Sequence, residues 1–175
     1  MRLHGKRIAI LAENIYQEME LWVPYYRLKE EGGTVKIIGT GTGKTYTSKH
    51  GYPVHVDASA NEVKSTDFDA VVIPGGYAPD LMRRSDAMVR LVKEAFEAGK
   101  VVAAICHAGW VLCSAGILQG KTATGFSSIK DDMVNAGARF VDQEVVVDGN
   151  LITSRKPDDI PAFCRELVKA LEKMG

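Results

Sequence analysis

The chain lacks long apolar runs, an excess of either charge and a paired-cysteine motif. No uninterrupted apolar stretch approaches the roughly 20 residues that span a bilayer. Lysine plus arginine and aspartate plus glutamate both number 22, so the formal net charge is zero and favours neither nucleic acid nor an anionic membrane as a partner. The apolar run at residues 8–12 is too short for a signal peptide, and we therefore expect a cytoplasmic protein.

The chain also has few cysteines. Cys106, Cys113 and Cys164 form no C-x-x-C pair and are odd in number, which favours neither a disulfide framework nor a structural zinc site. Cys113 and Cys164 fall at core positions of expected helices. We predict no metal and no cofactor, and Cys106 is the candidate reactive thiol.

The apolar pattern predicts one α/β domain over residues 1–175 with a three-layer arrangement. The apolar share of 46% and the charged share of 25% are ordinary for a globular protein of this size. Core strands are expected at residues 7–12, 34–38, 69–74, 101–105 and 151–154, and helices at residues 18–31, 86–98, 108–115, 128–135 and 158–173. Shorter strands are expected at residues 44–46, 52–56, 121–126, 139–141 and 144–147, with a hairpin turn at Asp148-Gly149. The β-α-β order of the first 40 residues is typical of an α/β sheet.

Cys106 stands where a buried strand ends and a helix is expected to begin. At a helix N-terminus, unpaired N–H groups and the helix dipole favour a thiolate, which is the nucleophilic form of cysteine. His107 follows directly and can accept a proton. The alternative is a small buried side chain followed by a histidine that caps the helix, and position alone does not decide between them.

Two further motifs lie at neighbouring strand ends. Gly75 and Gly76 follow a core strand, where their backbone N–H groups can hold an oxyanion, although a tight turn explains them equally well. Glu20 lies just inside the first helix. If the strands at residues 7–12 and 101–105 are neighbours, its carboxyl group faces Cys106 and burial can keep it protonated. Otherwise Glu20 is an ordinary acid at a helix N-terminus.

Other polar motifs point to no chemistry. The stretch at residues 39–45 resembles a phosphate-binding loop, but Ile38 occupies the position of its first glycine and no helix follows. We therefore predict a turn. His4, His50 and His55 are expected at the terminus or on the surface.

Taken in order, five motifs resemble those of a known family. They are Glu20 in Glu-Met-Glu-Leu, Lys49-His50-Gly51, Pro74-Gly75-Gly76, Ala104-Ile105-Cys106-His107 and Ser154-Arg155-x-Pro157. The set resembles the PfpI-type intracellular peptidases. These form one superfamily with the parkinsonism-associated deglycases and are related in fold to class I glutamine amidotransferases. The similarity extends over essentially the whole chain and implies a flavodoxin-like sandwich with a mostly parallel sheet flanked by helices.

The resemblance also implies roles for the candidate residues. Cys106 is the expected nucleophile on a strained turn, His107 the base or acid, and Glu20 the acid beside the sulfur. Gly76 and the His107 backbone are the expected oxyanion donors, and the neighbouring Gly75 lies at the same substrate site. The resemblance further implies a homodimer or homohexamer.

Three positions depart from the family pattern. Asp80 stands where peptidase-like relatives supply a glutamate to the neighbouring subunit, and its side chain is one methylene shorter. Trp110 adds bulk beside the expected site, so it would shape the substrate pocket. Lys156 replaces a frequent histidine, which makes amidotransferase activity implausible for this chain.

The sequence leaves three functions open. The first is a cofactor-free enzyme that adds Cys106 to a small aldehyde such as methylglyoxal, or to an early glycation adduct on an amine. The second is a cysteine peptidase, which needs an oriented imidazole and a groove for a peptide. The third is a redox-sensing stress protein or chaperone, because an activated thiol oxidises readily.

Overall fold

A central sheet of seven strands organises the chain, which the computed structural model describes over residues 1–175. Its strands are β1 (Arg7–Ala12), β2 (Thr34–Gly39), β5 (Ala58–Ser59), β6 (Ala70–Ile73), β7 (Val101–Ile105), β10 (Val146–Asp148) and β11 (Leu151–Ser154). They lie in the order β10-β11-β7-β6-β1-β2-β5, and only the edge strand β10 runs antiparallel to its neighbour. Numbered along the chain, the longer parallel strands follow the flavodoxin-like order 2-1-3-4-5, so the predicted fold class is confirmed.

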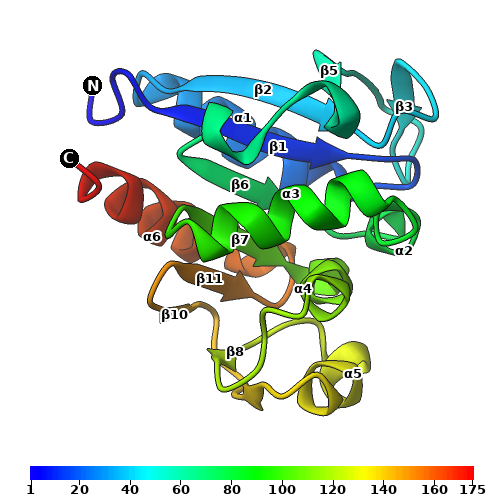
Figure 1. Cartoon of the computed structure of the whole chain (residues 1–175), viewed down its shortest axis with the longest axis vertical. Helices are drawn as coiled ribbons and strands as arrows, with labels where there is room; N and C mark the ends of the chain where they lie inside the picture. Colours follow the sequence, from blue (N-terminus) through cyan, green and yellow to red (C-terminus); the bar gives the residue numbers. More distant parts are fainter.

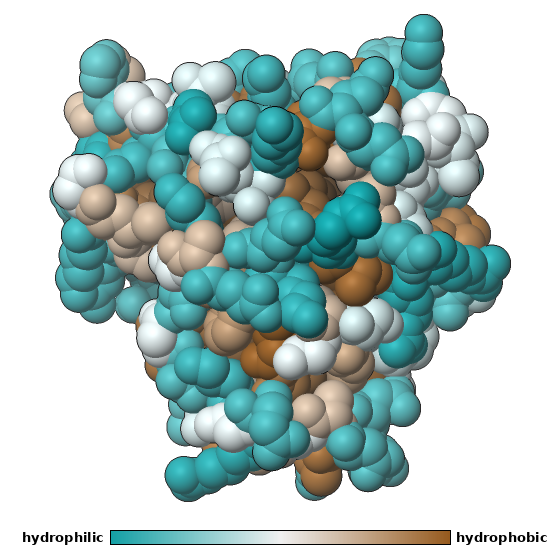
Figure 2. Space-filling view, in the orientation of Figure 1, coloured by the Kyte–Doolittle hydropathy of each residue, from teal (hydrophilic) through white to brown (hydrophobic).

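Helices cover both faces of this sheet (Figure 1). They are α1 (Glu18–Glu30), α2 (Ala78–Met82), α3 (Asp86–Glu97), α4 (Gly109–Ala115), α5 (Lys130–Asn135) and α6 (Ile160–Glu172). Helices α1 and α6 pack together on one face, and α3 packs with α4 on the other. Figure 2 shows that hydrophilic side chains cover most of the face that carries α3. No helix combines the length and the apolar composition needed to cross a membrane.

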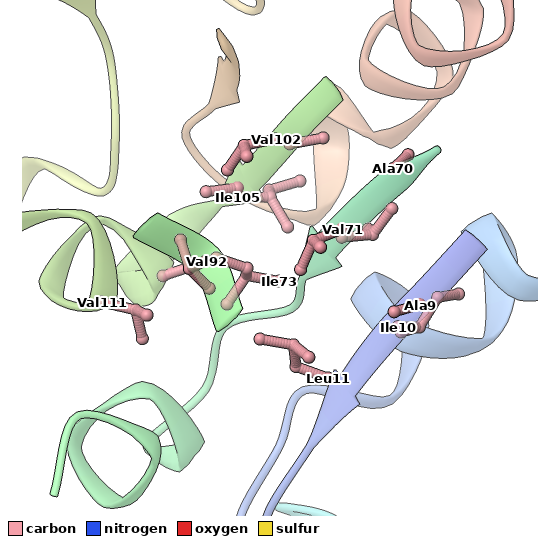
Figure 3. Packing of buried hydrophobic residues seen from close by; sticks show 14 of the residues in the cluster. Ala9, Ile10, Leu11, Ala70, Val71, Ile73, Val92, Val102, Ile105 and Val111 are labelled. Atoms are coloured by element: carbon pink, nitrogen blue, oxygen red, sulfur yellow. The ribbon is translucent and has the colours of Figure 1, made fainter. Parts of the chain in front are cut away.

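The core lies between these layers because the central strands are apolar on both faces. Every residue of β6 and β7 is buried. Figure 3 shows side chains of β1, β6 and β7 beside Val92 of α3 and Val111 of α4. Such continuous apolar runs are typical of parallel strands with helices on both sides.

Two small sheets complete the fold. Strands β3 (Thr45–Thr47) and β4 (Pro53–His55) form the predicted hairpin, and β8 (Thr122–Ala123) pairs with β9 (Arg139–Phe140). The loop before β3 is a turn, as predicted. The buried carboxylate of Glu13 accepts hydrogen bonds from the hydroxyl groups of Thr40 and Thr42 and holds this loop in place.

The structure decides one open question, corrects one turn and adds one helix. Strand β6 separates β1 from β7, so the strands that lead to Glu20 and Cys106 are not neighbours. The hairpin turn between β10 and β11 is Gly149-Asn150 rather than Asp148-Gly149, because Asp148 still pairs with Leu151. Helix α2 was not predicted, since five residues are too few to show a helical repeat.

Candidate active site

Cys106 occupies a strained corner at the carboxyl end of β7. Its φ of 64° lies in the left-handed region, which is uncommon for a residue with a side chain. Ile15 (φ 60°) is the other non-glycine residue with positive φ, and both line the same pocket. Strained backbone of this kind is found preferentially at functional sites. The corner continues as a 3-10 turn over Cys106–Ala108 before α4 begins at Gly109.

The loop after β6 lies against the loop after β1. Tyr16 and Gly76 form an isolated antiparallel bridge, and the Gln17 N–H donates to the carbonyl of Gly75 at 3.1 Å. Gly76 has a φ of 81°, and a Cβ there would lie 2.5 Å from the carbonyl oxygen of Ile15. No larger residue fits this approach. The backbone N–H of Gly76, with that of His107, is directed at the Cys106 sulfur.

Gly75 has a different role from the one expected for it. Its N–H donates to the Glu20 Oε1 at 2.9 Å and is therefore not free to bind an oxyanion. A Cβ at Gly75 would lie 2.5 Å from that oxygen and 2.7 Å from the Cβ of Cys106. Because Gly75 has no side chain, Glu20 and Cys106 can approach each other across the backbone that follows β6, although β1 and β7 are not neighbours.

Glu20 is placed by the start of α1. The Gln17 side chain accepts hydrogen bonds from the N–H groups of Met19 and Glu20, at 2.7 and 3.1 Å, and thereby caps the helix. The Glu20 side chain then points inward and is completely buried. Burial raises the pKa of its carboxyl group to about 7, against the opposing effects of the Gly75 N–H, the Cys106 thiol and Lys49. Glu20 can therefore gain or lose a proton near neutral pH.

The thiol of Cys106 does not behave as its place before a helix predicts. Burial, followed by the charge of Glu20, raises the pKa of Cys106 to about 12, while the N–H groups of Gly76 and His107 lower it. Only 7% of the residue is exposed, so loss of hydration outweighs the helix terminus. The resting sulfur is consequently a thiol, and its proton would have to pass to a neighbouring group in any reaction in which the sulfur acts as a nucleophile.

His107 is suited to receive that proton. Its Nδ1 lies 3.2 Å from the Cys106 Sγ, and its Nε2 lies 3.1 Å from the Oγ of Ser128. Burial and then the charge of Lys49 lower the pKa of the imidazole, so it is neutral at neutral pH. The ring stacks on Phe126 with centroids 4.7 Å apart. Sequence reasoning missed Ser128 because it lies 21 positions away in an unremarkable turn.

The pocket above the thiol is small and mostly walled by bulky side chains. Its volume is about 380 Å³, and it is lined by Ile15, Gln17, Lys49, Gly76, Tyr77, Cys106, His107, Trp110, Phe126 and Pro157. Trp110 belongs to this lining, with its ring centroid 5.1 Å from that of His107. A second pocket of about 490 Å³ shares Phe126 and includes Lys156, but it does not contain the thiol.

Lys49 reaches the pocket from a loop that Glu18 holds. The Glu18 carboxylate accepts hydrogen bonds from the Ser48 hydroxyl at 2.6 Å and the His50 N–H at 2.8 Å, and it also contacts the His50 ring at 2.9 Å. Although burial opposes the shift, these hydrogen bonds lower the pKa of Glu18 to about 2. His50 is exposed, as expected, and contributes to this loop contact rather than to the thiol.

Asp80 does not join the candidate site within one chain. It lies on α2, its carboxylate accepts a hydrogen bond from Arg84 at 2.5 Å, and it is absent from the lining of the Cys106 pocket. No hydrogen bond connects it to His107. The residues that the structure brings together around the thiol are Glu20, Gly75, Gly76, His107 and Trp110.

Known proteins are similar to this chain over most of its length. The DJ-1/PfpI family model matches residues 6–170. Deglycase PfpI of Pyrococcus furiosus is 46% identical over 95% of this chain and 99% of its own, and the putative cysteine protease YraA of Bacillus subtilis is 42% identical over 96% and 99%. A crystal structure from Anabaena variabilis, with a DJ-1/ThiJ/PfpI-like and a ferritin-like domain, has a TM-score of 0.93 at 45% identity, covering 95% of this chain and 48% of that protein.

Proposed function

The chain belongs to the DJ-1/PfpI family, and from that premise we propose that it is a cofactor-independent cysteine enzyme acting on reactive carbonyls. Its substrates would be small aldehydes such as methylglyoxal or early glycation adducts on amines, and it would act in the cytoplasm. One observation carries the proposal. The Cys106 thiol, which lines one small pocket, is beside a neutral imidazole in the same lining and beside the carboxyl group of Glu20, which is buried behind the lining and whose pKa burial raises to about 7.

The first step would be addition of the Cys106 sulfur to the aldehyde carbon. The thiol proton passes to the His107 Nδ1, 3.2 Å away, as the carbon–sulfur bond forms. The carbonyl π electrons move to oxygen, and the N–H groups of Gly76 and His107 point toward the developing charge. The product is a hemithioacetal once the imidazolium returns its proton to that oxygen.

The second step would move a proton between the two adjacent carbons. Glu20 as carboxylate removes the hydrogen from the carbon bound to sulfur, and as carboxylic acid it returns a proton to the neighbouring carbon, while the hydroxyl proton passes from the oxygen of the first carbon to that of the second. Its pKa of about 7, raised by burial, suits both directions. The resulting thioester reacts with water, which releases lactate and restores the thiol, so that methylglyoxal plus water gives lactate.

Peptide hydrolysis is the second candidate because a close relative is named a putative cysteine protease. It needs an imidazolium that protonates the leaving amine, and in such triads a carboxylate stabilises that ion. Within one chain no carboxylate contacts the His107 ring, since Asp80 is bound to Arg84. Addition to a carbonyl needs only a short-lived imidazolium at His107, so we rank this function first. We rank a redox-sensing role third.

The decisive experiment compares lactate formation from methylglyoxal by the wild type, Cys106→Ala and Glu20→Gln. We expect turnover by the wild type that both substitutions abolish. No lactate above the buffer rate would refute carbonyl chemistry, and hydrolysis of peptides by the same preparation would then favour the peptidase. Oxidation of Cys106 without any turnover would favour the redox role.

We also propose that the chain associates with copies of itself, as a dimer or hexamer. Support comes from α1, where the side chains of Met19, Val23 and Tyr26 are 55%, 41% and 63% exposed beside Trp22 and Tyr52. Exposed apolar side chains gathered in this way mark interaction surfaces. Sedimentation velocity of the wild type and Tyr26→Glu tests this: we expect a larger species only in the wild type, and a monomeric wild type would refute it.

A further inference from the structure

Within one chain, the imidazole of His107 has a neutral partner at the nitrogen where a carboxylate would complete a cysteine–histidine–acid triad. The Nε2 of His107 lies 3.1 Å from the Ser128 Oγ, in the 3-10 turn Ser127–Ile129. No other protein group hydrogen-bonds to the Ser128 hydroxyl. Asp80, the only acid that the sequence offered for this role, is bound to Arg84 on α2.

The segment that carries Ser128 also fixes the plane of the ring. Phe126 stacks on His107 at an interplanar angle of 26°, and its N–H donates to the carbonyl of Cys106 at 3.1 Å. Trp110 contacts the ring from another side and is itself held by a 3.0 Å hydrogen bond from its indole N–H to Asp132. Stacking restrains the tilt of the ring, and hydrogen bonds at both nitrogens set its rotation in the plane.

The proposed addition step sets the donor and acceptor pattern at the ring. For the His107 Nδ1 to take the thiol proton from the Sγ, 3.2 Å away, it has to carry a lone pair. In a neutral imidazole the proton is then on Nε2. That N–H donates to the Ser128 Oγ, which accepts.

We propose that Ser128 is a positioning residue that holds His107 as the Nε2–H tautomer, with the Nδ1 lone pair directed at the Cys106 thiol. The inference rests on the proposed carbonyl chemistry and deepens it. A hydroxyl group stabilises an imidazolium less than a carboxylate does. Ser128 therefore suits a histidine that takes the thiol proton during addition and returns it at once, and it does not suit one that must stay charged to protonate an amine.

The first test observes the tautomer and needs no activity. Nitrogen-15 NMR of histidine-labelled protein near pH 7.5 reports which ring nitrogen of His107 carries the proton. We expect the Nε2–H form in the wild type and a mixture of tautomers in Ser128→Ala. Ser128→Thr keeps a hydroxyl and should restore the wild-type pattern, and Ser127→Ala is the matched control in the same turn. The Nδ1–H form in the wild type, or an unchanged tautomer in Ser128→Ala, would overturn the proposal.

The second test measures lactate formation from methylglyoxal by the same four proteins. We expect kcat to fall about tenfold in Ser128→Ala with little change in KM, and to recover in Ser128→Thr. The other charged or titratable groups near the ring are Cys106, Glu20 and Lys49, and none of them is altered. An unchanged kcat in Ser128→Ala would count against the role. If the wild type makes no lactate, the proposed reaction fails while the NMR result still decides the role of Ser128.

Discussion

Replacing Gly75 with alanine places a methyl group where Glu20 and Cys106 meet. The added Cβ would lie 2.5 Å from the Glu20 Oε1, 2.7 Å from the Cys106 Cβ and 3.0 Å from the carbonyl oxygen of Ile105. Two of these atoms belong to short or buried groups that cannot swing away. The carboxyl group has to move, and the substitution thus separates the acid from the thiol while both remain in the protein.

The size of the effect follows from this overlap. Overpacking a well-filled core costs about 1–3 kcal/mol. In a domain of this length, each kcal/mol lowers Tm by about 3 °C, so Gly75→Ala should lower it by about 3–9 °C. Misplacing a reacting group by about 1 Å costs about 100-fold in rate, and we expect kcat for lactate formation to fall by that factor in the molecules that remain folded.

The assay pairs thermal unfolding with lactate formation for Gly75→Ala and Gly43→Ala. Gly43 is the matched control, because a Cβ there would meet its nearest neighbour at an ordinary 3.6 Å and its φ is not positive. The control should match the wild type in both measurements. If Gly75→Ala keeps the Tm and kcat of the wild type, the proposed contact between Glu20 and Cys106 is not needed, and the account of the site is wrong.

Three further predictions concern the carboxyl groups of Glu20, Glu18 and Asp80. Burial raises the pKa of Glu20 from 4.5 to about 7, so the folded state binds more protons than the unfolded state between these values, and the free energy of unfolding falls as pH rises through that window. Glu20→Gln should remove this fall, and in urea unfolding at pH 8 its free energy of unfolding should exceed that of the wild type by up to about 3 kcal/mol. Glu18→Gln should loosen the loop that carries Lys49 and raise KM for methylglyoxal more than it lowers kcat. If KM and kcat of the variant equal those of the wild type, the hydrogen bonds of Glu18 do not position Lys49 for the substrate. Asp80→Asn should leave lactate formation within about twofold, because its carboxylate binds Arg84 and a surface ion pair contributes little; a loss of 100-fold would show that it reaches a site in another subunit.

The strands of the core could be predicted because their sequences leave little choice. The run that became β7 is apolar throughout and that of β1 is apolar after Arg7, and each strand begins and ends at the predicted residue. The order of the strands in the sheet could not be predicted in the same way, because no local sequence pattern indicates which strands are neighbours. The expected contact between Glu20 and Cys106 therefore occurs by another route, across Gly75 at the end of β6.

The chemistry of the candidate site depends still more on tertiary structure. The sequence places Cys106 before a helix, which predicts a lowered pKa, but burial of the sulfur raises the pKa instead. Burial is a property of the whole fold and has no signature at one position. Ser128 illustrates the same limit: serine is common in turns, and only the folded chain brings its hydroxyl group to the His107 ring.

The most direct test of the proposed mechanism follows methylglyoxal by proton NMR in deuterated buffer, with the wild type and Cys106→Ala side by side. The account predicts lactate from the wild type alone, with deuterium at the carbon that bears its hydroxyl group, because Glu20 exchanges its proton with solvent while it carries hydrogen between the two carbons. Lactate that retains the aldehyde hydrogen of the substrate, together with an unchanged rate in Glu20→Gln, would contradict the proton shuttle. Equal lactate from Cys106→Ala, or none above the buffer rate from the wild type, would contradict the role of the thiol itself.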